Sequence, residues 1–294
     1  MVEYRVHLIL YLCFHGRTLI MKSMLFLEFR NCLNRNEFKF IFILLILISI
    51  GGFAFACIRY YGLDIIYTRS AFEMCLLREI TARILYGVEC ALMPLLASII
   101  YSDSYYSDFQ TGVYNNILTR TDARIYIWTK AIVIIIVVFF AFFIPLVLNQ
   151  LFCMIAFPLQ GFDNNFALPP YDIGVQNYNS SSMFDLLRLQ SPLLYNFLYM
   201  CLFSLFGALF ALFTYGAFFI FKKNKFTTIT GVFLLYIAVE VVVNALGNFR
   251  MSLVELLQPG NNGQLGILLL WMSALFLLSL AMIIIKSIKH RTDV

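Results

Sequence analysis

Charged residues are scarce in this chain of 294 residues: they make up 13% of it, against 62% hydrophobic residues, and the mean hydropathy is +0.85. A soluble domain, in which about a quarter of the residues are charged, is therefore excluded. The seven cysteines form no C-x-x-C pair and have no histidine at ligand spacing, so we expect no metal site. No G-x-x-x-x-G-K-[S/T] run occurs, which excludes a P-loop for nucleotide phosphates.

The chain has instead six long apolar stretches. Each approaches the roughly 20 residues of helix that cross a bilayer core about 30 Å thick. They cover residues 40–58, 84–102, 131–153, 193–221, 227–247 and 268–285. Because they are apolar on every side rather than at alternate positions, they predict lipid-embedded helices and not the strands of a barrel. The predicted fold is all-α, with an N-terminal segment over 1–39 and a six-helix transmembrane domain over 40–294.

Lysine and arginine are unevenly distributed between the connecting segments. Most of them fall in segments that lie inside the cell if both termini are cytoplasmic. The positive-inside rule therefore predicts an N-in, C-in protein of the cell membrane, with 102–130 inside and 158–192 outside. The net charge of +5 follows from insertion and from attraction to lipid headgroups, and it calls for no nucleic-acid partner.

The N-terminal segment lacks the small-residue cleavage pattern of a removable signal. Met21 and Met24 are alternative starts, and the sequence leaves open whether residues 1–20 are translated. The following residues predict an amphipathic helix in the inner interface, because apolar and polar side chains separate at helical spacing. The expected apolar face holds Leu25, Phe26, Phe29 and Leu33. The expected polar face holds Glu28, Arg30, Arg35 and Glu37.

The polar segment 102–130 is longer than a simple turn between two spans requires. Gly112 should interrupt any helix that continues from the second span. Val113, Ile117 and Leu118 then form an apolar strip on a short second helix that ends in the turn at 119–123. Such a strip has two interpretations: it fits a groove on a soluble partner, or it lies on the membrane surface. Periodicity does not separate them.

This loop resembles the cytoplasmic loop of ABC-2 type transporter permeases. In that family an acidic residue, a glycine, a leucine pair, a basic turn and a lysine opening the third span recur in this order. The corresponding residues here are Asp108, Gly112, Ile117, Leu118, Arg124 and Lys130. The family often has proline and serine before the arginine, whereas this chain has Thr-Asp-Ala at 121–123. The six-span plan, the interfacial helix and the basic C-terminal tail are similar to the family over nearly the whole chain.

The resemblance implies that the loop is a coupling helix docking on a separate ATP-binding subunit. It further implies two such subunits and two permease copies, for which a C2 dimer is the expected symmetry. ATP and Mg would bind to the partner, so this chain would carry no cofactor and would be no enzyme. The family exports amphipathic peptides and other hydrophobic substrates. The sequence does not identify the substrate or separate a homodimer from a heterodimer, and a sensing or regulatory ABC membrane subunit is an alternative.

Glu89 and Glu240 are the carboxylates that lie deep inside predicted spans, both roughly 10 Å from the outer boundary at 1.5 Å per residue. Asn244 lies one helical turn from Glu240. Charge at this depth is unfavourable, so these side chains face protein or water. One interpretation is a polar patch along a translocation path, and the other is hydrogen bonding that fixes helix packing. A proton-coupled secondary carrier, as a further alternative, would use the two carboxylates as proton sites.

Two S-x-x-[D/E] patterns occur in the outer segments. Ser182 to Asp185 and Ser252 to Glu255 each predict a short helix that begins with a serine cap. Cys57 and Cys75 both fall near the outer face, and the sequence leaves open whether they form a disulfide.

Overall fold

The computed structural model describes residues 21–63, 68–119, 121–159, 178–221 and 224–289. The described residues are mainly helical and contain no strand, only an isolated bridge between Ser182 and Asn262. The all-α prediction is therefore confirmed. Residues 1–20, whose translation the sequence leaves open, and much of the predicted outer loop 158–192 lie outside the described residues.

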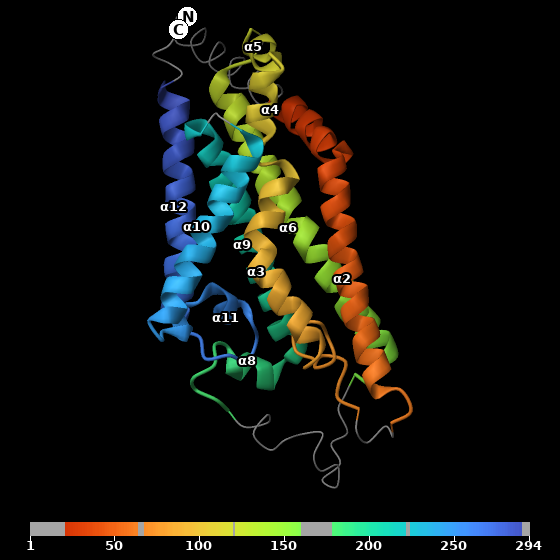
Figure 1. Ribbon diagram of the computed structural model, residues 1–294. Helices are drawn as coiled ribbons and strands as arrows, with labels where there is room; N and C mark the ends of the chain where they lie inside the picture. The colour runs from red at the N-terminus through yellow and green to blue at the C-terminus, as the bar shows by residue number, and fades with distance from the viewer. Residues whose placement is uncertain (1–20, 64–67, 120, 160–177, 222–223, 290–294) are drawn as a thin grey trace, which may run out of the picture.

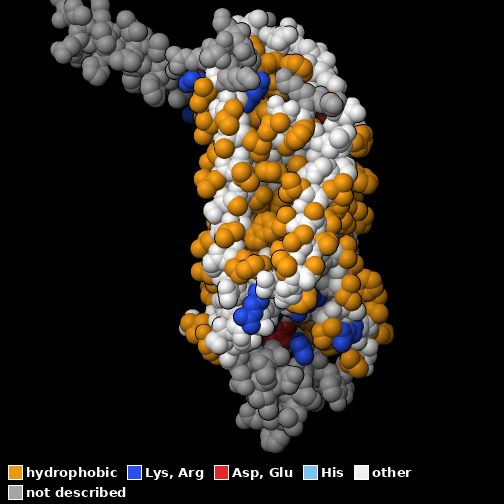
Figure 2. All heavy atoms as spheres, turned by 60° about the vertical axis from the view of Figure 1, so that its left-hand side comes forward, with side chains coloured by type: hydrophobic (Ala, Val, Ile, Leu, Met, Phe, Trp, Pro, Cys, Tyr) orange, Lys and Arg blue, Asp and Glu red, His pale blue; other side chains and the backbone are white. Residues whose placement is uncertain are grey.

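Among the described residues, six long helices run along the axis of the molecule (Figure 1). They are α2 (Asn36–Tyr60), α3 (Ala82–Tyr101), α6 (Ala123–Ala156), α9 (Pro192–Ile220), α10 (Lys225–Ala245) and α12 (Leu265–Lys289). All six are long and apolar enough to cross a membrane, which confirms the six-span plan. Figure 2 shows hydrophobic side chains along the middle of the visible face, and lysines and arginines near its two ends.

The third span, α6, begins at Ala123 and not near residue 131, where the apolar stretch starts. The side chain of Asp122 accepts a hydrogen bond from the Arg124 amide at 3.2 Å and so caps the helix. The extra turns carry Tyr126 and Lys130, which are both buried. The helix therefore extends into the predicted loop because its polar residues have partners there.

The short elements lie at the two ends of the bundle (Figure 1). One end, called the loop end below, carries α4 (Ser104–Gln110), α5 (Val113–Leu118) and a helix over residues 21–34. The other, the cap end, carries α8 (Asp185–Gln190), η2 (Phe249–Met251), α11 (Leu253–Leu257) and the segment 68–81. The helix 21–34 and the last turns of α12 both lie at the loop end (Figure 1). The side of the membrane that this end faces stays a prediction.

The spans differ in how far they are enclosed. In the most apolar part of α9, 67% of the residues are buried, compared with 28% in α2 and α10 and 22% in α12. The helices α3, α6 and α9 thus form the interior, and α2, α10 and α12 present most of their surface outward. Gly207 of α9 allows α6 to approach closely, because a Cβ atom there would lie 3.1 Å from the Phe142 ring.

The segment 68–81 at the cap end is irregular yet buried. Leu76 and Leu77 are fully buried, although this stretch contains no long helix. Asn149 of α6 accepts the Leu76 amide at 2.8 Å and donates to the Ser49 carbonyl at 2.7 Å. Irregular backbone is tolerated among apolar helices only where its polar groups are satisfied, and Asn149 satisfies one of them, the Leu76 amide, while it also contacts α2 through the Ser49 carbonyl.

Two further amides hold the same segment. Gln150 of α6 donates to the Ala71 carbonyl at 3.1 Å, and Asn196 of α9 donates to the Phe72 carbonyl at 2.7 Å. The Asn196 amide also donates to Gln150 at 2.9 Å. The cap end is therefore closed by a buried segment that side-chain amides attach to two spans, α6 and α9.

The helix over 21–34 differs from the prediction in the direction of its faces. Glu28, expected on the polar face, is only 2% exposed, whereas Phe26, expected on the apolar face, is 75% exposed. The prediction was wrong for Glu28 because this carboxylate has charged and hydroxyl partners on neighbouring helices, described below, whereas Leu25 and Phe29 pack against the core as expected. The chain then turns at Arg35, whose backbone is extended, and enters α2.

The two serine patterns had different outcomes. Ser252 caps α11, accepting the Glu255 amide at 3.4 Å as predicted. Ser182 caps no helix, because α8 begins only at Asp185. The Ser182 hydroxyl instead donates to the Gly260 carbonyl at 3.3 Å, across the cap end. Tertiary contact thus replaces the local cap that the pattern predicted.

Candidate functional site

The segment after α3 folds into two short helices, α4 and α5, that form a hairpin at the loop end (Figure 1). Gly112 joins them with φ of +74°, in the left-handed region that favours glycine. The predicted interruption at Gly112 is therefore confirmed. Arg124 follows the hairpin on the first turn of α6 and is exposed.

The predicted apolar strip on α5 is divided between two environments. Val113 is 43% exposed, while Ile117 and Leu118 are half-buried and contact the hydrophobic core. Tyr114, which the sequence analysis did not select, is 4% exposed and points inward. The hairpin thus presents Val113 at its surface and uses the rest of the strip to attach itself to the bundle.

Aromatic rings form the base of the hairpin. The Tyr114 ring centroid lies 5.3 Å from that of Tyr105 on α4 and 5.5 Å from that of Tyr126 on α6. Tyr105 also meets Phe219 of α9 edge to face at 4.8 Å. Burial, and then the neighbouring Tyr105, raise the pKa of the Tyr114 hydroxyl above its ordinary value, so this ring stays neutral. The base therefore packs four helices together through neutral, edge-to-face rings.

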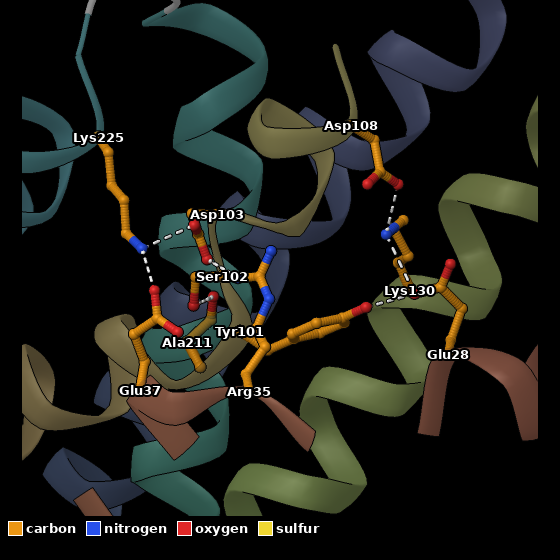
Figure 3. Close-up of polar contacts among 10 residues, drawn as sticks. All are labelled: Glu28, Arg35, Glu37, Tyr101, Ser102, Asp103, Asp108, Lys130, Ala211 and Lys225. Atoms are coloured by element: carbon orange, nitrogen blue, oxygen red, sulfur yellow. Dashed lines mark hydrogen bonds and ion pairs between the residues drawn. The ribbon is translucent and has the colours of Figure 1, made fainter. Parts of the chain in front are cut away.

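Lys130 is the centre of a buried ion-pair cluster beside this base (Figure 3). Its side chain is 1% exposed, and Nζ lies 2.9 Å from the Asp108 carboxylate and 3.0 Å from the Glu28 carboxylate. The Tyr101 hydroxyl donates to Glu28 at 2.5 Å, and the Tyr126 hydroxyl donates to Asp108 at 2.7 Å. Each carboxylate thus has two donors, which is what a buried charge requires.

Asp103 is the centre of a second cluster at the same end of the bundle (Figure 3). Its carboxylate lies 2.5 Å from the Arg35 guanidinium and 2.9 Å from the Lys225 ammonium. Lys225 also pairs with Glu37 at 3.0 Å, and the Arg35 guanidinium stacks over the Tyr101 ring at 4.8 Å. Burial acts to lower the pKa of Arg35, but the Asp103 carboxylate outweighs it and raises the pKa above its ordinary value.

The two clusters connect helices that are distant in the sequence. The Lys130 cluster joins the helix over 21–34 to α3, α4 and α6, and the Asp103 cluster joins the starts of α2 and α10 to the end of α3. Removing one partner of such a pair leaves a buried charge uncompensated, at about 3–5 kcal/mol. The spans are therefore mechanically linked where the α4–α5 hairpin is attached.

The structure brings together Asp108 and Lys130, two of the residues of the family resemblance. Sequence reasoning missed Glu28, Asp103 and Tyr101 as their partners and neighbours. A signal was present for the two carboxylates, because Glu28 and Asp103 each lie within or beside a stretch that packs among apolar side chains and so need a counter-charge. The local sequence does not indicate which cation pairs with each of these carboxylates.

Glu240 is buried on α10 and bonded to the cap end. Its carboxylate accepts the Ser252 hydroxyl at 2.6 Å and the Leu253 amide at 2.7 Å, so it holds the start of α11. Asn244, one turn further on, is exposed. These contacts agree with the interpretation of Glu240 as a residue that fixes packing.

Glu89 is only 2% exposed on α3, and within the described part of the chain its Oε2 atom has no hydrogen-bond partner. No hydrogen bond between Glu89 and Glu240 occurs among the described residues.

In the same part of the chain no group of three or more His, Cys, Asp or Glu side chains is arranged to hold a metal ion. Cys57 and Cys75 are free thiols.

Comparison of the chain with protein-family models, curated proteins and solved structures finds no match. The resemblance to ABC-2 permeases therefore depends on the residues of the chain itself, above all on Asp108, Gly112 and Lys130.

Proposed function

We propose that this chain is the membrane-spanning permease subunit of an ATP-driven exporter of the ABC-2 type. The observation that supports this most directly is the construction of the α4–α5 hairpin: an exposed apolar tip on a base that ion pairs connect to several spans. A coupling element needs both properties. The tip must contact a partner, and the base must pass the resulting displacement to the membrane helices.

The tip has the chemistry of a helix-in-groove contact. Val113 and Phe109 are 43% and 46% exposed on either side of the turn at Gly112 that joins α4 and α5. A small apolar tip of this kind fits a hydrophobic groove on a soluble protein. The proposed partner is a separate ATP-binding subunit, which binds ATP and Mg because this chain has no P-loop.

The base has the connections that coupling needs. Asp108 lies on α4, within the hairpin, and its partner Lys130 lies on α6, while Glu28 contacts the same ammonium from the N-terminal helix. A displacement of the hairpin therefore acts on a span and on an interfacial helix at once. In this proposal Asp108 contributes to coupling through its ion pair with Lys130 inside the chain, and it does not contact the ATP-binding subunit.

The proposed assembly contains two copies of the permease and two ATP-binding subunits, in the cell membrane. The proposed cargo is an amphipathic peptide or another hydrophobic substrate. A sensing or regulatory subunit would use the same docking surface, so the test of docking comes before any assay of transport.

The test compares two substitutions on α5 in the full chain, expressed in its native host. Val113→Asp places a charge in the exposed apolar tip, and Asn116→Asp places the same charge on an exposed position of the same helix. We expect wild type and Asn116→Asp to co-purify with ATP hydrolysis activity, and Val113→Asp to lose at least nine tenths of it with unchanged amounts in the membrane. Absence of an ATPase from the wild-type preparation, or equal ATPase in all three, would contradict the proposal.

A further inference from the structure

A polar pocket of about 420 Å³ opens beside the Asp103 cluster. Two cations, Arg35 and Lys225, and two carboxylates, Glu37 and Asp103, contribute to its wall, together with the amides of Gln110 and Asn224. Figure 3 shows Lys225 between Asp103 and Glu37, with Arg35 on the other side of Asp103. The side chains of Lys225 and Glu37 are 27% and 40% exposed, so a ligand can reach both signs of charge.

The pocket lies at the level where three spans begin or end. Glu37 is in the first turn of α2, Lys225 is the first residue of α10, and Asp103 follows directly after the end of α3. The apolar parts of these helices start on one side of that level. It is therefore the level of the lipid headgroups, between hydrocarbon and water.

One face of α3 leads from the hydrocarbon into this pocket. Leu92 is 37% exposed on this face and lies about 16 Å from Asp103 at 1.5 Å rise per residue, within the thickness of one leaflet. Leu95 and Ile99 continue the face at helical spacing and are half-buried. The next positions along it are Asp103, Tyr106 and Gln110, which line the pocket. The surface thus changes from apolar on α3 to polar at Asp103 and on α4.

Neighbouring spans flank this face on both sides. Both α2 and α10 contact α3, and Figure 1 shows α3 between them. An extended acyl chain along the stripe of Leu92, Leu95 and Ile99 would bring its headgroup to the pocket. The stripe and the pocket together have the amphipathic order of a membrane lipid.

We propose that this pocket binds the headgroup of a phospholipid with a terminal primary ammonium, of the phosphoethanolamine type, whose acyl chain lies along α3. The charges favour a zwitterion, because the two cations and two carboxylates balance and a purely anionic headgroup would lie against Asp103 and Glu37. The phosphate accepts from Lys225 and the amides, and the ammonium donates to Glu37. A primary ammonium has three such donors, whereas a quaternary ammonium has none. This site is independent of the proposed export function.

The experiment measures lipid binding to the purified full chain in detergent by native mass spectrometry. Phosphatidylethanolamine, phosphatidylcholine and phosphatidylglycerol with identical acyl chains are offered separately. We expect one phosphatidylethanolamine per chain, bound at least tenfold more tightly than either of the others. Equal or tighter binding of phosphatidylglycerol would overturn the proposal.

Two variants connect the binding to this pocket. Ser107→Trp fills the pocket while keeping all four charges, and its matched control, Ser273→Trp, places the same ring on an exposed position of α12. We expect Ser107→Trp to weaken phosphatidylethanolamine binding more than tenfold and Ser273→Trp to leave it unchanged. Glu37→Gln, which alters little of the packing, should reduce the preference for ethanolamine over choline at least threefold. Unchanged binding in Ser107→Trp, or an unchanged preference in Glu37→Gln, would contradict the assignment.

Soluble phosphoethanolamine separates a lipid from a small water-soluble ligand with the same chemistry. Because it lacks the acyl chain, we expect it to compete at least a hundredfold less well than the lipid. Competition at equal concentration would show that the stripe on α3 contributes nothing and would overturn the lipid assignment.

Discussion

Polar groups are buried at both ends of the bundle, where the membrane helices begin and end, but the kind of partner that they have differs between the two ends. At the cap end, neutral amides of Asn149, Gln150 and Asn196 bond to the main chain of segment 68–81. At the loop end, Lys130 and Asp103 hold charged side chains from different helices. Ion pairs such as Arg59–Glu79 and Arg78–Glu73 occur at the cap end as well, but there the buried segment is attached to the spans by side-chain amides, whereas at the loop end charged side chains connect the helices.

The difference has a mechanical consequence. An amide that satisfies a backbone group fixes one local conformation, since any displacement leaves that group without a partner. An ion pair between long side chains connects helices but tolerates small changes in their separation, because the Coulomb energy falls gradually with distance. We therefore expect the cap end to be the more rigid of the two and the loop end to be the one suited to transmit movement.

The largest expected effect comes from removing the central cation of the loop end. Lys130→Met leaves Glu28 and Asp108 facing each other without a counter-charge, and we expect the free energy of unfolding to fall by about 3–5 kcal/mol. Denaturant unfolding of the purified chain measures it. Adding Glu28→Gln and Asp108→Asn to the same variant removes the uncompensated charge and should restore most of the stability. A single variant as stable as wild type would show that Lys130 is no anchor.

A somewhat smaller effect is expected from Asn149→Leu at the cap end. It leaves the Leu76 amide and the Ser49 carbonyl without this partner, which lowers the free energy of unfolding by about 2–4 kcal/mol. Burial raises the pKa of the Cys75 thiol to about 11, so this cysteine reacts slowly near neutral pH.

Thiol labelling of Cys75 distinguishes the two ends, in a background where the other cysteines are replaced. Asn149→Leu loosens the segment that contains Cys75 and should accelerate labelling at least tenfold. Lys130→Met acts at the opposite end and should leave the rate unchanged. Equal acceleration in both variants would mean that the two ends do not behave as separate structural units.

The serine caps give a smaller contrast within the cap end. Ser252→Ala removes the cap of α11 and a donor to Glu240, so we expect a loss of about 1–2 kcal/mol. Ser182→Ala removes only exposed hydrogen bonds and should change the stability by less than about 0.5 kcal/mol. Unfolding curves measured side by side test this order, and a larger loss in Ser182→Ala would reverse our interpretation.

The smallest effect concerns pH at the cap end. Burial acts to raise the pKa of Asp185, but hydrogen bonds from Arg188 and the Asn179 amide outweigh it, so its pKa lies below the ordinary value of about 3.9. The contribution of Asp185 to the free energy of unfolding is therefore complete when the pH is above the ordinary pKa, and it is lost as the pH falls through the lowered pKa of the folded state. Asp185→Asn should be less stable than wild type at pH 6, and the difference should shrink towards pH 3. A constant difference would contradict this assignment.

Much of the fold was predictable because its causes are local. The six spans follow from apolar length, the break at Gly112 from the lack of a Cβ atom, and the cap at Ser252 from a hydroxyl three residues before an amide. The faces of the helix over 21–34 were mispredicted, because periodicity treats every carboxylate as solvent-facing. Glu28 is buried because Lys130 of α6 provides its counter-charge. Periodicity could not show this, because the two residues lie 102 positions apart in the sequence.

The sequence by itself determined the medium, the number of helices and the absence of a nucleotide-binding loop, because length, hydropathy and short motifs are properties of neighbouring residues. Only the tertiary structure decided which charges meet. Glu28 and Asp108 converge on Lys130, and Glu240 holds α11, because helix packing brings those side chains within hydrogen-bond distance. Pairing at such range depends on how whole helices pack against one another, and no local pattern in the chain encodes it.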